Sequence, residues 1–275
     1  MIFAMSDIHG HFELMKERID QIMPYLKEGN HKLVLLGNYI GRGNSSFQCL
    51  KAAFDLQKEL GEDKVIVLKG DNERCFVGVL YECEGVWVAI DDDFGISSTF
   101  LTKEQLEDLK KIPAITEQHT LWIKHGIEVN DLEARQVSFI KECIRTNDRE
   151  LVSWLGKLKT YYETETQIFV HAGVDENIPE DEIEECTLRT PEYVLTGKYP
   201  PTKGHFYKDI IAGHVATSVV ANDPNFEGIY FDGESHFYIN GTTICTNRLL
   251  CLAYNEDTKE YYEFMEDGTF KKIGK

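Results

Sequence analysis

The sequence of 275 residues has little positive charge and no long apolar run. Its formal net charge of -18 opposes nonspecific attraction to nucleic acid and to anionic membrane surfaces. No stretch reaches the roughly 18 consecutive apolar residues of a membrane-spanning helix. We therefore expect a protein that binds neither nucleic acid nor membranes, and in which a phosphorylated ligand would depend on local cationic groups.

Paired cysteines and targeting signals are also missing. The seven cysteines are odd in number and show no spacing such as Cys-x-x-Cys, which argues against a disulfide framework. No basic segment with an apolar core precedes the first expected strand, as a signal peptide would require. We expect a cytoplasmic protein. No repeat or linker rich in proline and glycine divides the chain, so we expect one domain over residues 1–275.

Strand and helix patterns alternate in the first third of the chain and predict a parallel sheet. Residues 73–158 have mostly helical apolar spacing and are expected to form a helical insertion. The β-rich end predicts a second sheet, which includes a closing hairpin. The expected helices span residues 11–27 and 45–60, and the expected strands span residues 2–5, 32–36, 64–68, 167–170, 209–212, 228–231, 236–239, 249–254 and 260–265.

Three of these strands end in a similar way. The strand at 2–5 leads into Asp7 and His9, and those at 167–170 and 209–212 lead to His171 and His214, each beside or near glycine. A lone histidine in such a place is more often a hydrogen-bonded loop residue. The joint pattern instead favours loops that converge on one metal centre at the carboxyl ends of the strands.

Five motifs extend this pattern along the chain. They resemble the signature of the phosphoprotein phosphatase branch of the calcineurin-like metallophosphoesterases, which runs Asp-x-His-Gly, Gly-Asp-x-x-Asp-Arg-Gly, Gly-Asn-His-Glu, His-Ala-Gly and Gly-His. The resemblance implies an α/β fold, a four-layer αββα sandwich of two mixed sheets, with a two-metal site at one edge. The motifs are Asp7-Ile8-His9-Gly10, Gly37-Asn38-Tyr39-Ile40-Gly41-Arg42-Gly43, Gly70-Asp71-Asn72-Glu73, His171-Ala172-Gly173 and Gly213-His214.

The resemblance also implies roles for individual residues. Asp7 and His9 would hold a first metal, and His171 and His214 a second. Imidazole and carboxylate ligands suit Mn, or else Fe or Zn, better than Ca. We expect one or two such ions per chain.

Two arginines match the residues with which the family clamps phosphate. Arg42 lies within its motif, and Arg189 corresponds more loosely. A guanidinium fork suits two phosphate oxygens. The expected partner is a phosphorylated protein or a nucleotide-like small molecule.

The sequence departs from the family at the bridging ligand. Asn38 stands where the family has its bridging aspartate, and Asp71 stands where the family has an asparagine. A neutral amide is a poor bridge between two cations that repel each other. Asp71 can supply the missing carboxylate, so both residues remain candidate ligands, and a single bound metal is an alternative.

The family's general acid is also replaced. Asn72 occupies the position of the histidine that protonates the leaving oxygen, and Gly41 that of the aspartate that orients it. An amide cannot deliver this proton. His11 and His125 are alternative acids, and Glu73 is either a support for the ligands or a favourable charge at a helix start.

These losses define two functional hypotheses. The first is a metal-dependent phosphoesterase with weakened or redirected hydrolysis of phosphate esters or phosphoanhydrides. The second is a pseudophosphatase that binds a phosphorylated partner or nucleotide without cleaving it.

Overall fold

The computed structural model describes residues 1–81, 95–112 and 131–274, and the chain divides into two compact units. The larger unit comprises Met1–Arg74 and Leu158–Lys275, and the smaller unit comprises Cys75–Lys157. The predicted insertion, residues 73–158, nearly coincides with the smaller unit; a single domain that includes it stays a prediction. None of the described helices is both long and apolar enough to cross a membrane.

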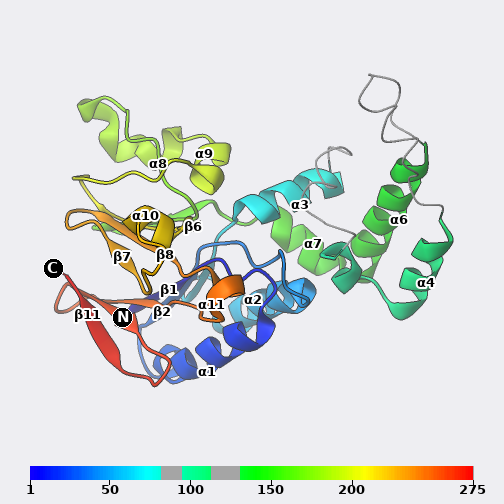
Figure 1. Cartoon of the computed structure of the whole chain (residues 1–275), viewed down its shortest axis with the longest axis horizontal. Coiled ribbons are helices and arrows are strands. Elements are labelled where there is room, and N and C mark those ends of the chain that lie inside the picture. The colour runs from blue at the N-terminus through cyan, green and yellow to red at the C-terminus, as the bar shows by residue number, and fades with distance from the viewer. Residues whose placement is uncertain (82–94, 113–130, 275) are drawn as a thin grey trace. The chain divides into compact units, whose positions relative to one another are not determined.

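The first sheet has six strands in the order β11-β10-β9-β1-β2-β3 (Figure 1). The parallel pairs β1–β2 and β2–β3 follow the predicted βαβαβ order, and β9 runs antiparallel to β1. The sheet is therefore mixed. Its strands are β1 (Ile2–Met5), β2 (Lys32–Leu35), β3 (Val65–Val67), β9 (Leu252–Asn255), β10 (Glu260–Phe264) and β11 (Phe270–Ile273).

The second sheet has five strands in the order β4-β5-β6-β8-β7. Its central pairs, β5–β6 and β6–β8, are parallel, whereas β4 and β7 are antiparallel to their neighbours. The strands are β4 (Tyr161–Glu163), β5 (Gln167–Val170), β6 (Asp209–Ala216), β7 (Tyr230–Phe231) and β8 (His236–Asn240).

The closing hairpin corrects one prediction. We expected it in the second sheet, but β9 pairs with β1 through Ile2 and Tyr254 and so extends the first sheet. The pairing places Tyr254 in the core between the sheets, where its ring packs at a tilt against that of Tyr261 of β10, with the ring centroids 4.7 Å apart. Burial of these aromatic side chains against the other sheet explains why the hairpin joins β1.

Alternate side chains of the strands face two different cores, as the period of two in a strand requires. Ile2 and Ala4 of β1 lie in one cluster with Phe169 of β5 and Phe237 of β8, so this cluster fills the space between the sheets. Ile168 of β5 belongs to a second cluster on the outer face of the second sheet. The predicted αββα sandwich of two mixed sheets is confirmed.

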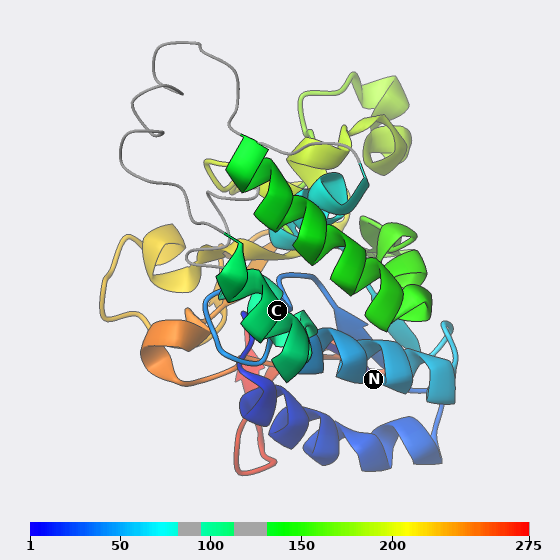
Figure 2. The same ribbon diagram turned by 90° about the vertical axis from the view of Figure 1, so that its right-hand side faces the viewer.

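Helices cover the outer faces of both sheets. In α1, Met15, Ile19 and Ile22 recur at helical spacing and are buried, while the other face is polar. Figure 2 shows α1 and α2 side by side along the first sheet, and α8, α9 and α10 contribute Cys186, Leu195 and Val220 to the outer core of the second sheet. The helices of this unit are α1 (Phe12–Glu28), α2 (Ser46–Leu60), α8 (Cys186–Arg189), α9 (Glu192–Gly197), α10 (Thr217–Ala221), α11 (Thr243–Thr246) and the 3-10 helix η4 (Glu180–Glu185).

The smaller unit is helical in its described part. Helix α3 begins in the larger unit and continues into this one, and α6 packs against α4 and α7. Its helices are α3 (Asp71–Tyr81), η3 (Ser97–Phe100), α4 (Lys103–Lys111), α6 (Asp131–Asn147) and α7 (Arg149–Gly156).

Candidate metal centre

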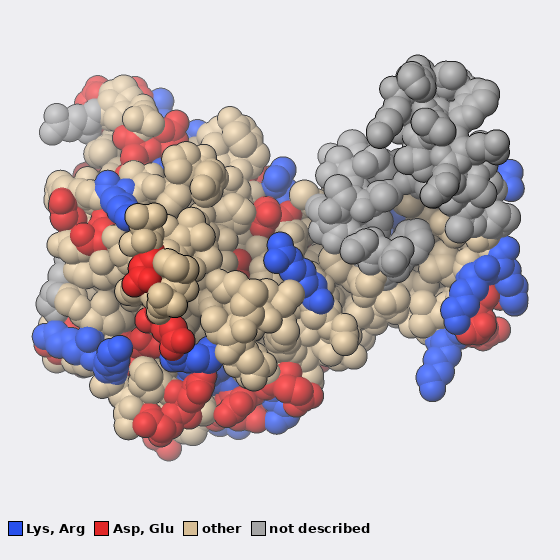
Figure 3. Space-filling model, viewed as in Figure 1, with Lys and Arg blue, Asp and Glu red and all other residues tan. Residues whose placement is uncertain are grey.

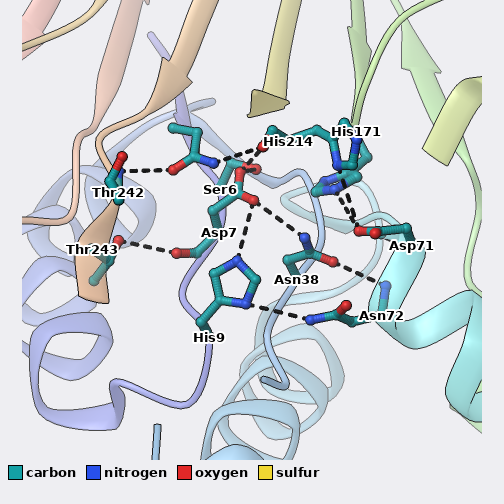
Figure 4. Close-up of polar contacts among 12 residues, drawn as sticks. Ser6, Asp7, His9, Asn38, Asp71, Asn72, His171, His214, Thr242 and Thr243 are labelled. Atoms are coloured by element: carbon teal, nitrogen blue, oxygen red, sulfur yellow. Dashed lines mark hydrogen bonds and ion pairs between the residues drawn. The ribbon is translucent and has the colours of Figure 1, made fainter. Parts of the chain in front are cut away.

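The predicted ligands meet at the carboxyl ends of strands from both sheets (Figure 4). Asp7 follows β1, Asn38 follows β2, and Asp71 begins α3 just after β3. From the second sheet, His171 follows β5 and His214 lies in the last part of β6. The parallel order of the central strands therefore brings these residues, far apart in sequence, to one edge.

Three of them form what we call the Asp71 cluster, namely Asp71, His171 and His214. One ligand atom of each lies within 4.8 Å of the other two. Asp71 Oδ1 is 3.2 Å from His171 Nε2 and 3.6 Å from His214 Nδ1. His171 is fully buried, while Asp71 and His214 are partly exposed, so the cluster is open to solvent on one side.

The hydrogen bonds of His171 determine which of its nitrogens is free. Nδ1 lies 3.1 Å from the Leu36 carbonyl oxygen, which only accepts, so Nδ1 carries the proton. The lone pair of Nε2 then points toward Asp71. Neither His171 Nε2 nor Asp71 Oδ1 has a hydrogen-bond partner, although both atoms are buried. Such a pair of unpaired buried atoms fits a divalent metal, which imidazole and carboxylate commonly bind.

The charges of this cluster stabilise one another. Burial raises the pKa of Asp71, but the neighbouring imidazoles of His171 and His214 outweigh this effect, and the pKa is lowered. Burial lowers the pKa of His171, and the Asp71 and Asp7 carboxylates raise it above its usual value. An ionised Asp71 is therefore favoured at this site, and its negative charge suits a bound cation.

The residues around Asp7 form a different arrangement, which we call the Asp7 network: Ser6, Asp7, His9, Asn38 and Asn72. Asp7 Oδ2 accepts hydrogen bonds from Ser6 Oγ at 2.7 Å and from the His214 backbone N–H at 2.9 Å. Asp7 Oδ1 accepts from Asn38 Nδ2 at 3.2 Å and lies 3.5 Å from His9 Nε2. Burial raises the pKa of Asp7, but the contact with His9 and the charges of His171 and His9 lower it to about 2.

Asn72 connects the other members of the Asp7 network. Its backbone N–H donates to Asn38 Oδ1 at 3.1 Å, and its side-chain Nδ2 donates to the Ile40 carbonyl oxygen at 2.8 Å. The same Nδ2 lies 3.4 Å from His9 Nδ1. The predicted site residue Asn72 is therefore adjacent to His9, and its polar groups are engaged within the loops.

Glu73 serves as an anchor for these loops. Its fully buried carboxylate accepts four backbone N–H groups, from Asn38, Tyr39 and Ile40 after β2 and from Gly70 after β3. Burial raises the pKa of Glu73 more than these hydrogen bonds lower it. We predicted Glu73 either as a support for the ligands or as a favourable charge at a helix start, and these contacts agree better with the first.

Several candidate residues have strained backbone. Asp7, His9, Asn38 and His214 all have φ between 48° and 58°, in the left-handed region that residues other than glycine rarely adopt. Such strain often gathers at functional sites. The strained backbone turns these polar side chains toward the sheet edge. A continued extended strand would carry them away from that edge.

Residues at the end of β8 and at the start of α11 hold this backbone in place and were not predicted as part of the site. Thr243 Oγ1 donates to the Asp7 carbonyl oxygen at 3.0 Å (Figure 4). Asn240 Nδ2 donates to the His214 carbonyl oxygen at 2.9 Å. The polar residues directly after the strand at 236–239 were the available sequence signal.

The two predicted phosphate-binding arginines lie in different settings. Arg42 is exposed on the loop after β2 and has no ion-pair partner among the described residues. Arg189 is half exposed, and its guanidinium contacts Glu182 at 2.7 Å and Glu185 at 3.1 Å. Lysine and arginine side chains are interspersed with acidic ones on the described surface in Figure 3. Cationic help for a phosphate would therefore come from individual side chains.

The site has no room for the aspartate of the family's acid dyad, whose position Gly41 occupies. Gly41 has φ +152°, and a Cβ added there would collide with His9 Nδ1 and approach Asn72 Nδ2 to 3.1 Å. His11, an alternative acid, is half-buried, and burial and the charge of His9 lower its pKa. His125 lies outside the described residues.

Comparison with solved structures shows the fold. The chain is similar to a protein-tyrosine phosphatase of a psychrophile, Shewanella sp., with a TM-score of 0.52 and 11% identity over 99% of this chain and 80% of that one. A point mutant of a cold-active protein tyrosine phosphatase has a TM-score of 0.51 and 12% identity over 99% of this chain and 80% of that one. A putative diadenosine tetraphosphatase has a TM-score of 0.44 and 14% identity over 100% of this chain and 93% of that one.

At such low identity the likeness shows fold alone, and the predicted resemblance to calcineurin-like phosphatases is confirmed at that level. No protein-family model matches the sequence, and no curated protein matches it significantly. The chain thus has a phosphoesterase-type fold.

Proposed function

We propose that this protein is a metal-dependent phosphoesterase that hydrolyses aryl phosphates or phosphoanhydrides, on a phosphorylated protein or a nucleotide-like small molecule. The observation that carries the proposal is the Asp71 cluster. Its ligand atoms lie within 4.8 Å of one another at the strand ends of a phosphatase fold. The buried atoms without partners, His171 Nε2 and Asp71 Oδ1, are those that a metal would contact.

Asp71, His171 and His214 would hold the ion, for which we favour Mn over Fe or Zn. A bound divalent metal acts as a Lewis acid toward a phosphoryl oxygen and lowers the pKa of water. The Leu36 carbonyl keeps the His171 ring in the orientation that a ligand needs. Arg42 is exposed on the loop after β2, next to Gly43, whose N–H donates to the His9 carbonyl oxygen, and would bind phosphate oxygens through its guanidinium.

The proposed substrate class follows from the lack of a general acid. Asn72 cannot donate a proton to a leaving oxygen, since its amide is not acidic and its Nδ2 already donates a hydrogen bond to the Ile40 carbonyl oxygen. General acid catalysis contributes about 10²- to 10⁴-fold, most of all for basic alkoxides. Aryl esters and anhydrides have weakly basic leaving groups and lose least. Two of the similar solved structures are protein tyrosine phosphatases by name, and phosphotyrosine is an aryl ester.

The preference for weakly basic leaving groups is tested on the Mn-loaded protein. We expect kcat/KM for p-nitrophenyl phosphate to exceed that for a phosphoserine peptide by at least about 100-fold, the lower range of an acid's contribution. Chelation of the metal should abolish both activities, and Asp71→Ala should do the same. Comparable rates on the two substrates would rule out the proposed preference.

A binding-only protein is the second candidate, favoured by the hydrogen bonds that engage Asp7 and Asn72. A phosphotyrosine peptide would then bind without turnover. The double substitution Asn38→Asp with Asn72→His restores two family residues, and Gly41 is left unchanged because a side chain there would collide with His9. Appearance of hydrolysis only in this variant would favour the binding protein; activity in the native chain would exclude it.

A further inference from the structure

The Asp7 carboxylate has no free position for a metal. An ionised carboxylate offers about four acceptor sites. Ser6 Oγ and the His214 N–H occupy Oδ2, while Asn38 Nδ2 and His9 Nε2 face Oδ1. With Asp7 only 1% exposed, water does not compete for these positions. Four donors therefore satisfy both oxygens.

The orientation of the Asn38 amide is fixed by its neighbours. Asn38 Oδ1 accepts from the Asn72 backbone N–H, which is only a donor. The NH2 end must therefore point at Asp7. An amide nitrogen has no lone pair for a cation, and the Asn38 oxygen is already engaged. Asn38 thus places a hydrogen-bond donor where a bridging ligand would need an anionic oxygen.

The tautomer of His9 follows by the same reasoning. The Ile40 carbonyl oxygen only accepts, so the Asn72 atom 2.8 Å from it is the amide nitrogen. Its second proton faces His9 Nδ1 at 3.4 Å, which makes Nδ1 the acceptor. The ring proton then lies on Nε2, which faces Asp7 Oδ1. His9 Nε2 is therefore a donor to Asp7 and has no lone pair for a metal.

The opposite holds in the Asp71 cluster, where His171 Nε2 is unprotonated and without a partner. We propose that the protein binds a single divalent ion, at Asp71, His171 and His214, and that the hydrogen bonds of the Asp7 network take the place of a second ion. This inference rests on the proposed metal dependence. It also explains why a neutral residue is compatible at position 38: with one cation there is no repulsion between two for a bridging anion to offset.

The number of bound ions tests the proposal directly. Metal-free protein is loaded with Mn, and its stoichiometry is measured by native mass spectrometry, with electron paramagnetic resonance on the same sample. We expect one Mn per chain and the spectrum of an isolated ion. Two Mn per chain with an exchange-coupled spectrum would overturn the inference, and so would the absence of bound Mn.

Three variants locate the ion. His214→Ala should lose at least nine-tenths of the bound Mn, whereas His9→Ala should keep one Mn per chain. Asn38→Asp should raise the stoichiometry to two, because it replaces a donor with a carboxylate beside Asp7. If Asn38→Asp does not fold, the two histidine variants decide: equal loss of Mn in both would contradict the proposal.

Hydrolysis of p-nitrophenyl phosphate by the same samples separates this inference from the proposed function. One Mn per chain without any hydrolysis would remove the proposed function and leave the single-ion site standing. Two coupled Mn ions with hydrolysis would do the reverse.

Discussion

The two halves of the candidate centre contain similar residue types but differ in what their polar atoms face. In the Asp71 cluster, an imidazole nitrogen and a carboxylate oxygen point at each other without a hydrogen bond. In the Asp7 network, a carboxylate and an imidazole also lie together, but amide and hydroxyl donors satisfy the carboxylate. Residue type alone therefore does not decide which half can bind a metal.

The difference arises from the atoms just outside each half. A backbone carbonyl, that of Leu36, holds the proton on the far side of His171. An amide, that of Asn72, faces His9 from the corresponding side and places the proton on the near nitrogen. Groups that do not touch the metal commonly set the state of a histidine ligand in this way. The following substitutions test this difference between the two halves and are ordered from the largest expected effect to the smallest.

The largest effect is expected from His171→Ala. Loss of a residue that only hydrogen-bonds to a metal ligand lowers metal affinity or activity about 10- to 100-fold. Removal of a ligand itself should therefore lower activity by more than about 100-fold. The stabilisation of the protein by Mn, seen as a rise in Tm, should also disappear. His205→Ala, at an exposed histidine, is the matched control and should change neither. A retained Mn-dependent rise in Tm in His171→Ala would show that the cluster is not the metal site.

Glu73→Gln should weaken both halves together, since this carboxylate ties the loop after β2 to that after β3. The amide NH2 of glutamine would face backbone N–H donors, so we expect the free energy of unfolding to fall by about 2 to 4 kcal/mol. Urea denaturation measures the change, and Glu59→Gln, on the exposed face of α2, is the control. A loss no larger than in the control would contradict the anchoring role.

Asp7→Asn should alter the pH dependence of stability in the metal-free protein. The pKa of Asp7 is lowered from 3.8 to about 2 in the folded state, so the folded protein binds fewer protons than the unfolded one in this range. The resulting stabilisation, about 2 kcal/mol, is complete above pH 4 and is lost as the pH falls toward 2. The variant should show a shallower loss of stability there. An unchanged slope would mean that Asp7 is not held by its donors.

The strand pattern made much of the fold predictable. Short apolar runs at Ile2–Met5 and Gln167–Val170 are buried strands as expected, because both faces of each lie against a core. The edge strands Tyr161–Glu163 and Phe270–Ile273 were missed, since they are short and partly exposed. The hairpin was assigned to the wrong sheet because pairing over 250 residues depends on tertiary packing, which no local pattern encodes.

The positions of the site residues could be predicted, but their hydrogen bonds could not. Asp7 and His171 follow strands and His214 lies in the last part of β6, and parallel strands that end at one edge must bring the three together. The direction of the Asn38 amide depends on Asn72, 34 residues away. Such an orientation is fixed only once the loops are folded, as is the strained backbone that carries it.

The smallest effect is expected from the arginines, which test whether a phosphate is held on the side of the Asp7 network. Arg42→Ala should raise KM for p-nitrophenyl phosphate, because its exposed guanidinium has no ion-pair partner among the described residues and is available to an anion. Arg189→Ala should change KM less, since Glu182 and Glu185 already engage that side chain. Steady-state kinetics of the two variants measure both effects. A larger rise in KM for Arg189→Ala would mean that the phosphate displaces the two glutamates and that Arg42 binds no substrate.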